Sequence, residues 1–374
     1  MSWAIWITGL PGSGKSTIAR AAAQLLRDRG RPVTVLELDA VRKRIAPRLL
    51  YTEAERELVY RALGYMAAAL TEGGVPVIVD ATAHRRAWRE AARAAIPRFA
   101  EVQLLCPLDV CGERERRRAP GEAPASIYAR AGRPGATVPG VDVAYERALK
   151  PELVIDTTVD APQAAAVKVA ALADRLAETA ESSPARAAGW AIWITGRPGS
   201  GKTTLAARVA EALHGWPIPV QVLDLHSARR TILGRGWAAE AGDELVHRTL
   251  ALTAKLLTEA GVAVILDATA PRRAWREAAR EWIAHFGEVQ LVCPPEVCVE
   301  REQAARWRLG ASQAAGGTTG APDIVLEYEE SLHPDLRLHT HVPDLMSTVD
   351  EVLALARRLT RAAGRVADTE RTVP

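Results

Sequence analysis

The sequence predicts two α/β domains in tandem, each built on a parallel sheet with helices on both faces. Short apolar runs of strand length alternate with amphipathic stretches of helix length. Such alternation with fully apolar strands is typical of a parallel sheet that helices cover on both sides. The whole pattern occurs twice, since the segment around Lys202 repeats the segment around Lys15. A period this long indicates a duplicated domain and not a solenoid repeat.

The expected elements of the first copy follow from apolar spacing and from the residues at their ends. The first helix, for example, ends at Gly30, a residue that favours helix termination. Strands are expected at residues 3–8, 32–38, 75–80, 100–106 and 152–157, and helices at 16–30, 52–74, 85–96 and 161–178.

Composition places the domain boundaries. Residues 177–189, AETAESSPARAAG, are small and polar and include a proline, which is typical of a linker. The first domain is therefore expected at residues 1–180 and the second at residues 188–362. Residues 363–374 lack sustained apolar spacing and are expected to form a frayed tail.

Composition also restricts the class of protein. The 374 residues are 48% hydrophobic and carry a formal net charge of +3, which is ordinary for a globular protein and gives no electrostatic footprint for nucleic acid. No apolar run approaches the ~20 residues that span a bilayer, and the N-terminus has no secretory signal pattern. We therefore expect a cytoplasmic protein without membrane contact. The chain has no asparagine, which excludes the N-K-x-D loop of many GTPases.

The cysteines form one C-x4-C pair in each copy. No histidine accompanies either pair at ligand spacing, so we interpret them as small buried residues and not as metal ligands.

A glycine-rich segment follows the first predicted strand. Its sequence, GLPGSGKS, precedes a predicted helix, which is the context of a phosphate-binding P-loop. Backbone N–H groups of such a loop surround a phosphate, while Lys15 reaches the β- and γ-phosphates and the Ser16 hydroxyl takes a Mg²⁺ position. ATP and Mg²⁺ are thus the expected ligands. The expected ATP-binding residues are Gly9, Leu10, Pro11, Gly12, Ser13, Gly14, Lys15, Ser16 and Thr17.

Polar residues follow two other strands, where ligands of open α/β sheets collect. Asp39 and Arg42 come after the second strand. The aspartate can orient or deprotonate an acceptor hydroxyl, and the arginine can hold an anionic group. Asp80 ends the third strand, the usual place of an acid that holds Mg²⁺. Helix capping is the alternative for both aspartates, and both interpretations stay open.

Arginines in two further segments are candidates for anion contacts. Arg86 and Arg89 lie on the first turns after the third strand, where a solvated helix face is the alternative. Residues 113–140 are charged and then Gly/Pro-rich, which is typical of a lid that closes over ATP. The candidate phosphate contacts of this lid are Arg114, Arg117 and Arg118.

Several motifs together resemble the adenylylsulfate (APS) kinase family, whose members phosphorylate the ribose 3′-hydroxyl of adenosine 5′-phosphosulfate with ATP. The resemblance rests on WITGLPGSGKSTIA, on LELDAVR for L-D-G-D-x-x-R, on YTEAER for F-S-x-x-D-R, on CPLDVCGERE for C-P-L-E-V-C-x-x-R, and on PGVDVAYERALKPELVIDT. It covers residues 1–160 and implies a P-loop kinase fold with APS as acceptor. Family members are generally dimers, so it also implies a homodimer or a pseudo-dimer of the two halves.

The resemblance implies a role for each matching residue. Asp39 would prepare the acceptor hydroxyl, Arg56 would contact the phosphosulfate, and Tyr51 replaces the phenylalanine that stacks on the APS adenine. The implied acceptor-binding residues are Asp39, Arg42, Tyr51, Arg56, Arg86 and Arg89. The expected catalytic residues are Lys15, Asp39 and Asp80, and the expected metal ligands are Ser16 and Asp80.

The first copy also departs from the family pattern. Val59 stands where the family has a substrate-contacting asparagine, Ala125 where it has a lid lysine, and Val138 where it has the second aromatic of the adenine clamp. Asp80 replaces a residue that is small in many members. The alternatives are therefore a P-loop kinase of another acceptor (a nucleoside, a small metabolite or an RNA end) and a nucleotide-dependent regulatory protein.

The second copy keeps the nucleotide loop and loses acceptor residues. GRPGSGKT, residues 196–203, retains every phosphate-binding element, but His226 and Asp243 stand where the first copy has Asp39 and Arg56. We therefore expect ATP binding without APS phosphorylation, with His226 as a base for another acceptor as the alternative. The expected ATP-binding residues are Gly196, Gly199, Ser200, Gly201, Lys202, Thr203 and Thr204, with Thr203 and Asp267 as metal ligands.

Overall fold

The computed structural model of the chain describes residues 1–48, 52–117, 127–178, 188–234, 240–313, 327–341 and 345–370. The chain divides into two compact units, Met1–Ser183 and Pro184–Pro374. Each unit contains one five-stranded parallel sheet covered by helices. The predicted fold class is confirmed.

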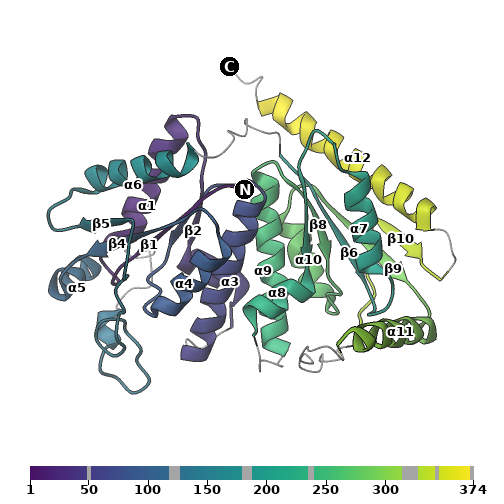
Figure 1. The fold of residues 1–374 in the computed structure, drawn as a ribbon, viewed down its shortest axis with the longest axis horizontal. Coiled ribbons are helices and arrows are strands. Elements are labelled where there is room, and N and C mark those ends of the chain that lie inside the picture. The colour runs from purple at the N-terminus through teal and green to yellow at the C-terminus, as the bar shows by residue number, and fades with distance from the viewer. Residues whose placement is uncertain are drawn as a thin grey trace. The chain divides into compact units, whose positions relative to one another are not determined.

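The strands of the first unit are short runs rich in Ile, Val and Leu, which favour an extended backbone. They pair in parallel in the order β2-β3-β1-β4-β5 (Figure 1). Because β1 is central, the loop that follows it lies at the middle of the sheet's carboxyl edge. The strands are β1 (Ala4–Thr8), β2 (Thr34–Glu37), β3 (Val77–Asp80), β4 (Phe99–Leu105) and β5 (Leu153–Asp156).

Helices cover both faces of this sheet (Figure 1). On one face α1 and α6 pack against each other, and on the other α3 packs against α4. The helices are α1 (Lys15–Asp28), α2 (Leu38–Ile45), α3 (Glu53–Glu72), α4 (Arg86–Ala95), α5 (Leu108–Arg116) and α6 (Pro162–Ala177), with a 3-10 turn η1 (Tyr128–Arg130). The structure adds α2 and α5 to the elements that the sequence predicted.

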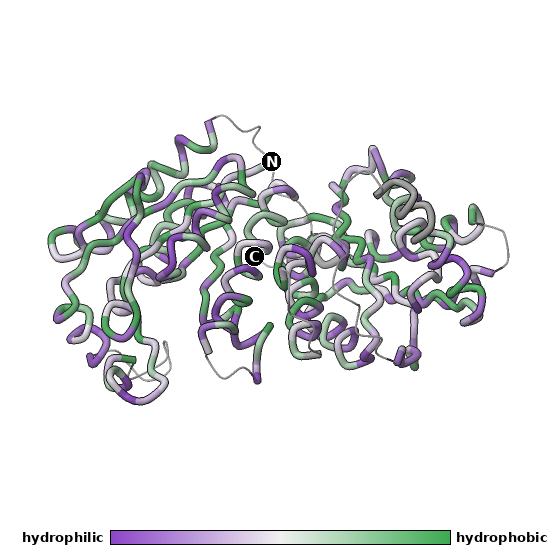
Figure 2. Tube along the Cα trace, turned by 60° about the horizontal axis from the view of Figure 1, so that its bottom comes forward, coloured by the Kyte–Doolittle hydropathy of each residue, from purple (hydrophilic) through white to green (hydrophobic). Residues whose placement is uncertain are grey.

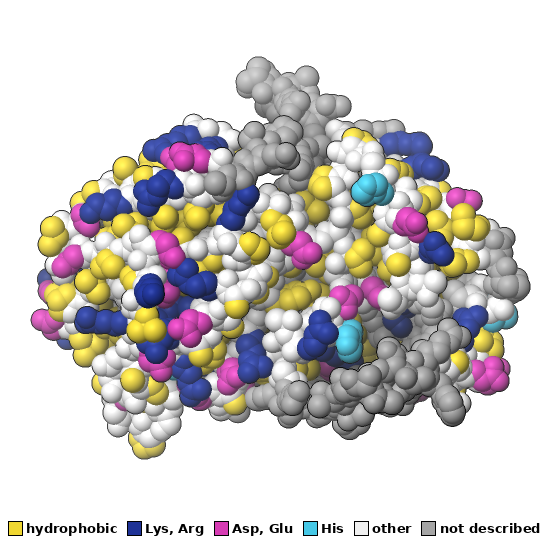
Figure 3. Space-filling model, viewed as in Figure 1, with side chains coloured by type: hydrophobic (Ala, Val, Ile, Leu, Met, Phe, Trp, Pro, Cys, Tyr) yellow, Lys and Arg dark blue, Asp and Glu magenta, His cyan; other side chains and the backbone are white. Residues whose placement is uncertain are grey.

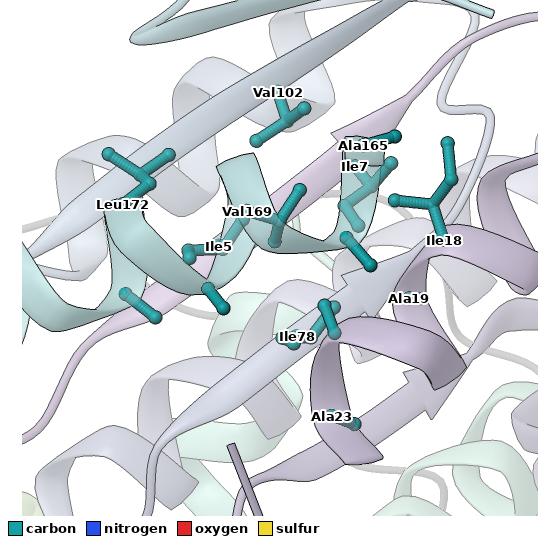
Figure 4. Packing of buried hydrophobic residues seen from close by; sticks show 14 of the residues in the cluster. Ile5, Ile7, Ile18, Ala19, Ala23, Ile78, Val102, Ala165, Val169 and Leu172 are labelled. Atoms are coloured by element: carbon teal, nitrogen blue, oxygen red, sulfur yellow. The ribbon is translucent and has the colours of Figure 1, made fainter. Parts of the chain in front are cut away.

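The core of the first unit lies between β1 and the helix pair α1 and α6. Figure 4 shows Ile5 and Ile7 of β1 close to Ile18 of α1 and Val169 of α6, and these side chains are at most 2% exposed. Burying such a side chain contributes about 1.5–3 kcal/mol. Hydrophobic and hydrophilic residues alternate along the helices of both units (Figure 2), as expected for helices with one buried face.

The second unit repeats this architecture. Its sheet has the order β10-β9-β6-β8-β7, so that β6 is central as β1 is. The strands are β6 (Ala191–Gly196), β7 (Val220–Asp224), β8 (Ala263–Asp267), β9 (Phe286–Val292) and β10 (Leu336–His339). The helices are α7 (Lys202–Ala212), α8 (Leu225–Ile232), α9 (Glu240–Glu259), α10 (Arg273–Trp282), α11 (Pro295–Gln313) and α12 (Leu345–Glu370).

The last helix differs from the prediction. α12 continues to Glu370, so residues 363–370 are helical where the sequence predicted a frayed tail. The physical reason is that the buried apolar face of the helix continues into Ala363, the first residue of the predicted tail. Val352, Ala356 and Ala363 share one helical face, and each is at most 3% exposed.

The described surface mixes charges of both signs. Figure 3 shows Lys and Arg side chains interspersed with Asp and Glu side chains over the face in view, which is the usual surface of a globular protein. Within the part of the chain that the structure describes, no helix is long and apolar enough to cross a membrane.

Candidate nucleotide and acceptor site

The loop between β1 and α1 forms the first nucleotide-binding element. Gly14, directly before α1, has a φ of 95°, a left-handed conformation that glycine adopts without steric cost. Lys15 begins the helix and is 9% exposed. Its ammonium donates to the carbonyl oxygens of Gly9 at 3.1 Å and Leu10 at 2.9 Å. The lysine is thus held against the loop, at the positive end of the helix dipole.

Gly12 allows this loop to approach α5 closely. Its φ is 79°, and a Cβ at this position would lie 2.3 Å from the carbonyl oxygen of Cys111. A backbone oxygen cannot rotate away as a flexible side chain can, so glycine is required here. Cys111 itself is buried with a free thiol, and this arrangement is consistent with the interpretation of the cysteines as small buried residues.

Asp80 lies beside the first residues of α1. It is 6% exposed, and burial raises the pKa of its carboxyl, whereas the Lys15 charge and a hydrogen bond with Ser16 lower it. Asp80 does not cap the following helix, because the residue that precedes α4 is Arg85. Carboxylate and hydroxyl oxygens are ligands that Mg²⁺ prefers. Ser16 and Asp80 therefore make a candidate magnesium site.

Asp39 and Arg42 lie on α2, which begins directly after β2. The pairing of β2 with β3 places Glu37 opposite Asp80, so the first turn of α2 lies at the same sheet edge as the P-loop. The Arg42 guanidinium lies 4.0 Å from the Asp39 carboxylate, and their side chains are 14% and 42% exposed. The residue that precedes α2 is Glu37. Asp39 is thus not the N-cap and is accessible to a substrate.

Arg56 approaches from α3. The start of this helix is fixed by a capping box between Thr52 and Glu55. The Arg56 Nη1 donates to the carbonyl oxygen of Thr137 at 2.7 Å. This bond ties Arg56 to the C-terminal part of the expected lid, residues 113–140.

The charges of three predicted acceptor residues act on Tyr60 of α3. Burial raises the pKa of the Tyr60 phenol, the charges of Arg42 and Arg56 lower it, and the charge of Asp39 raises it. The three charged groups therefore belong to one electrostatic environment. Tyr51, the expected adenine contact, lies outside the described residues, as does Arg118 of the expected lid.

Three other predicted arginines have partners within the chain. Arg86 forms an ion pair of 3.2 Å with Glu90 on the surface of α4. Arg114 donates to the Thr157 hydroxyl at 3.0 Å and to the Thr157 carbonyl at 2.7 Å, which ties α5 to the segment after β5. Arg117, directly after α5, forms a surface ion pair with Glu113 of that helix. Of these three, Arg114 lies on α5, the helix whose Cys111 carbonyl oxygen approaches Gly12.

Arg89, unlike these three arginines, is fully buried. Its side chain is 0% exposed, and its three nitrogen atoms all donate within the chain. The acceptors are Glu101 Oε1 at 2.5 Å, the Glu146 carbonyl at 2.6 Å and the Ala83 carbonyl. The sequence placed Arg89 on a charged helix face, but this position of α4 points inward. The structure thus gives the guanidinium no face toward an acceptor.

Sequence reasoning missed the buried polar partners of this site. These partners are Tyr60, which accepts from the Ala83 N–H, Glu101, which accepts from Arg89, and Tyr145, whose hydroxyl bonds to that of Thr8. A signal was present for two of them, because Glu101 and Tyr145 recur in the second copy as Glu288 and Tyr328, which make the corresponding contacts.

The second unit builds the same nucleotide element. Lys202 is 9% exposed and donates to the carbonyl oxygens of Gly196 at 3.1 Å and Arg197 at 3.0 Å. Burial lowers the pKa of Lys202 to about 8, and the charge of Asp267 opposes this shift. Asp267 in turn has a hydrogen bond with Thr203. The second unit therefore offers a lysine, a hydroxyl and a carboxylate in the arrangement of the first.

The acceptor side of the second unit is different. Asp243 is 5% exposed and stands where the first unit has Arg56. Its carboxylate lies 3.0 Å from Nε of Arg229, the counterpart of Arg42. His226, on the first turn of α8, is exposed. Both units have an arginine at the corresponding position, Arg42 and Arg229. In the second unit this arginine forms an ion pair with Asp243.

A comparison with known families identifies this architecture. The sequence model of the adenylylsulphate kinase family matches residues 1–156 and again residues 188–339. The chain belongs to the adenylylsulphate kinase family. The two matches coincide with the two copies of the nucleotide loop, so both units are members.

Individual relatives match this adenylylsulphate kinase family member over one or both copies. A probable adenylyl-sulfate kinase of Archaeoglobus fulgidus is 39% identical over 160 residues, 42% of this chain and 97% of the relative. A probable bifunctional SAT/APS kinase of Sorangium cellulosum is 27% identical over 89% of this chain and 54% of the relative. The structure of Mycobacterium tuberculosis APS kinase with AMPPNP and APS is 29% identical, with a TM-score of 0.38, over 46% of this chain and 99% of that one.

Family membership establishes the general activity. The chain is an ATP-dependent kinase whose substrates are small molecules. The geometry agrees with this class, because each unit presents a P-loop lysine beside a hydroxyl and a buried carboxylate.

Proposed function

We propose that the first unit phosphorylates adenosine 5′-phosphosulfate at its ribose 3′-hydroxyl, with ATP as the phosphoryl donor. The observation that carries the proposal is that Arg42 lies 4.0 Å from Asp39 on the helix after β2, and that the charges of both residues and of Arg56 act on the same side chain, Tyr60. An acceptor with a phosphosulfate group brings negative charge, which two guanidinium groups match. Asp39 provides a carboxylate for the reacting hydroxyl.

The proposed mechanism assigns each group a task. Lys15 and the N–H groups of the P-loop hold the β- and γ-phosphates of ATP. Ser16 and Asp80 would hold Mg²⁺, which would neutralise phosphate charge. Asp39 takes the proton of the 3′-hydroxyl as its oxygen bonds to the γ-phosphorus. The bond from the γ-phosphorus to the bridging oxygen breaks, and ADP leaves with that electron pair. Arg42 orients the acceptor.

We propose that the second unit binds ATP with magnesium and does not phosphorylate APS. Its nucleotide element matches that of the first unit. Its acceptor pocket lacks the Asp39 carboxylate, and Arg229 is neutralised by Asp243. The expectation of a homodimer or of pairing between the halves stays a prediction, which sedimentation velocity with and without ATP tests.

A kinase of a different small acceptor is the second candidate. Val59 and Val138 stand at positions where the family has an asparagine and an aromatic clamp residue, and they are 1% and 5% exposed. Apolar groups at both positions remove a hydrogen-bonding and a stacking partner for APS. This observation favours an acceptor other than APS.

The experiment is a coupled ADP-release assay with ATP and Mg²⁺, run without acceptor, with APS, and with a panel of nucleosides and sugars. We expect turnover that APS stimulates. Turnover on another acceptor and none on APS would replace the first proposal by the second.

Matched lysine variants apportion the activity between the units. We expect Lys15→Ala to abolish turnover and Lys202→Ala to leave a substantial fraction, because the second unit has His226 in place of the Asp39 carboxylate and Asp243 in place of Arg56. An equal loss from both variants would contradict the proposed asymmetry.

A further inference from the structure

Each of the three residues after Asp80 has a backbone group that accepts a hydrogen bond from a side chain. Trp6 Nε1 donates to the carbonyl of Ala81 at 3.1 Å, and Thr8 Oγ1 donates to the carbonyl of Thr82 at 2.6 Å. The next residue, Ala83, donates its N–H to the Tyr60 hydroxyl at 3.0 Å and accepts from Arg89 Nη1. Side chains from β1, α3 and α4 therefore fix the backbone that follows the candidate magnesium ligand.

Ala83 needs this support because of its conformation. Its φ is 39°, in the left-handed region that a residue with a Cβ rarely adopts. In the described part of the chain, one other non-glycine residue has a positive φ, and it is the counterpart Ala270 with 41°. Strained backbone persists where surrounding contacts determine it, and such positions cluster at functional sites.

Arg89 joins this strained backbone to two other parts of the first unit. One nitrogen holds Ala83, one holds Glu101 of β4, and one holds the carbonyl of Glu146. Glu146 follows Tyr145, whose hydroxyl lies 2.9 Å from Oγ1 of Thr8. A planar guanidinium has the fixed fork geometry to serve three acceptors at once, which an ammonium lacks.

The duplicated chain separates nucleotide functions from acceptor functions. The second unit has lost the acceptor carboxylate and reversed the charge at the Arg56 position. It nevertheless keeps the whole Arg89 arrangement, since Arg276 is 0% exposed and donates to Glu288 at 2.8 Å, to the Glu329 carbonyl at 2.6 Å and to the Ala270 carbonyl. The arrangement therefore accompanies the nucleotide loop and Asp267, not the acceptor pocket.

We propose that Arg89 is a positioning residue for Asp80 and Mg²⁺-nucleotide, and that it does not contact the acceptor. By holding Ala83 in the left-handed conformation, Arg89 keeps the Asp80 carboxylate beside Ser16 and Lys15. By also holding the Glu146 carbonyl, Arg89 keeps the segment that follows the expected lid close to the backbone of Ala83.

The test compares Arg89→Lys with Arg93→Lys. Lysine at position 89 keeps a positive charge opposite Glu101 but cannot serve all three acceptors. Arg93 is the matched control, because it lies on the same helix and approaches Glu101 at 3.7 Å, but its two terminal nitrogens bond to Glu152. Each full-length variant is measured for kcat, for KM of APS, for thermal unfolding, and for calorimetric binding of AMP-PNP with and without Mg²⁺.

The expected result for Arg89→Lys is a loss of about 10- to 100-fold in kcat and in the affinity for AMP-PNP with Mg²⁺. The KM for APS should stay within about twofold, and the affinity for AMP-PNP without Mg²⁺ should change little, since positioning acts through the metal ligand. Arg93→Lys should leave kcat and nucleotide affinity unchanged. Arg276→Lys should weaken the second Mg²⁺-nucleotide site in the same manner.

Two results would overturn the proposal. A rise in the KM for APS with unchanged kcat and nucleotide affinity would make Arg89 an acceptor contact, as the sequence suggested. A lower unfolding temperature with unchanged kinetics and binding would make it a structural residue only. The kinetic measurement rests on the proposed acceptor, whereas the calorimetric one does not, so failure of the two proposals is distinguishable.

Tyr60→Phe keeps the test decisive if Arg89→Lys does not fold. It removes the other side-chain bond to Ala83 and leaves the charges around Arg89 unchanged. The expected effect is a smaller loss of affinity for AMP-PNP that again depends on Mg²⁺. An affinity equal to that of the wild type would count against the proposal.

Discussion

Arg229 and Asp243 of the second unit form an ion pair of 3.0 Å between a half-buried guanidinium and a buried carboxylate. In the first unit the counterpart of Asp243 is Arg56, which donates to a backbone carbonyl and whose charge, like that of Arg42, lowers the pKa of Tyr60. One charge reversal thus replaces the second cation by a carboxylate, which pairs with the remaining cation. The fold of the two units is the same, and we expect this reversal to lower the preference of the second unit for anionic acceptors.

Arg56→Asp should reproduce this change in the first unit. The new carboxylate would pair with Arg42 and repel an anionic acceptor. Leaving a charge pair incomplete costs about 2 kcal/mol or more, so kcat/KM for APS is expected to fall by roughly 30-fold at least. Binding of AMP-PNP with Mg²⁺ should be retained.

The matched control for this reversal is Arg61→Asp. Arg61 lies on the same helix and pairs with Glu57 at the surface, so its reversal should change kcat/KM by less than about twofold. If both reversals lowered kcat/KM equally, a general effect of charge and not the pocket would be responsible.

Gly12→Ala should abolish nucleotide binding by the first unit. The added Cβ would lie 2.3 Å from the carbonyl oxygen of Cys111, so either the loop or α5 must move. Gly30→Ala is the control, because Gly30 also has a positive φ, 72°, but nothing lies within 4 Å of the added Cβ. The control should lose about 1 kcal/mol of stability and keep its nucleotide affinity. Calorimetry with AMP-PNP and urea unfolding separate the two effects.

The parallel sheet and the P-loop could be predicted from sequence because local patterns encode them. Apolar runs predicted the strands. A strand followed by a glycine loop and a helix predicted the position of Lys15 and Ser16 at the carboxyl edge of the sheet. Asp80 was predictable as well, since the last residue of a parallel strand adjacent to β1 must lie at that edge.

The buried polar contacts could not be predicted in the same way. The inward direction of Arg89 depends on Glu101, a strand residue, and on the Glu146 carbonyl, a loop atom 57 positions away. A sequence pattern on α4 alone shows only several arginines on a helix. The left-handed backbone of Ala83 was equally hidden, because alanine carries no sequence signal for a positive φ.

The thiols of Cys111 and Cys298 should react slowly with thiol reagents at neutral pH. Burial, followed by contact with the neighbouring cysteine, raises the pKa of Cys111 to about 12 and that of Cys298 to about 11. Since the thiolate is the reactive form, both thiols should stay protonated below pH 9. Titration with a chromogenic disulfide should show slow modification of the native protein and rapid modification of all four cysteines in denaturant. Rapid modification of native Cys111 would contradict this prediction.

Nucleotide binding to the second unit should weaken as pH rises through about 8. Burial lowers the pKa of Lys202 to about 8, so the free protein loses this proton between pH 7 and 9, whereas nucleotide phosphates bind the charged form. The affinity is expected to fall by about tenfold per pH unit above pH 8, with uptake of one proton on binding. In the unfolded chain the lysine keeps a pKa near ~10.4. Between these two values the unfolded state binds more protons, so the contribution of Lys202 to stability rises with pH.

The measurement is calorimetric titration of the Lys15→Ala protein with AMP-PNP and Mg²⁺ from pH 7 to 9. Running each titration in two buffers of different ionisation enthalpy gives the number of protons taken up on binding. Lys202→Arg is the control, because a guanidinium stays charged over this range and should remove both the pH dependence and the proton uptake. A constant affinity with no proton uptake in the Lys15→Ala protein would show that Lys202 is still fully charged at pH 9, and it would contradict the lowered pKa.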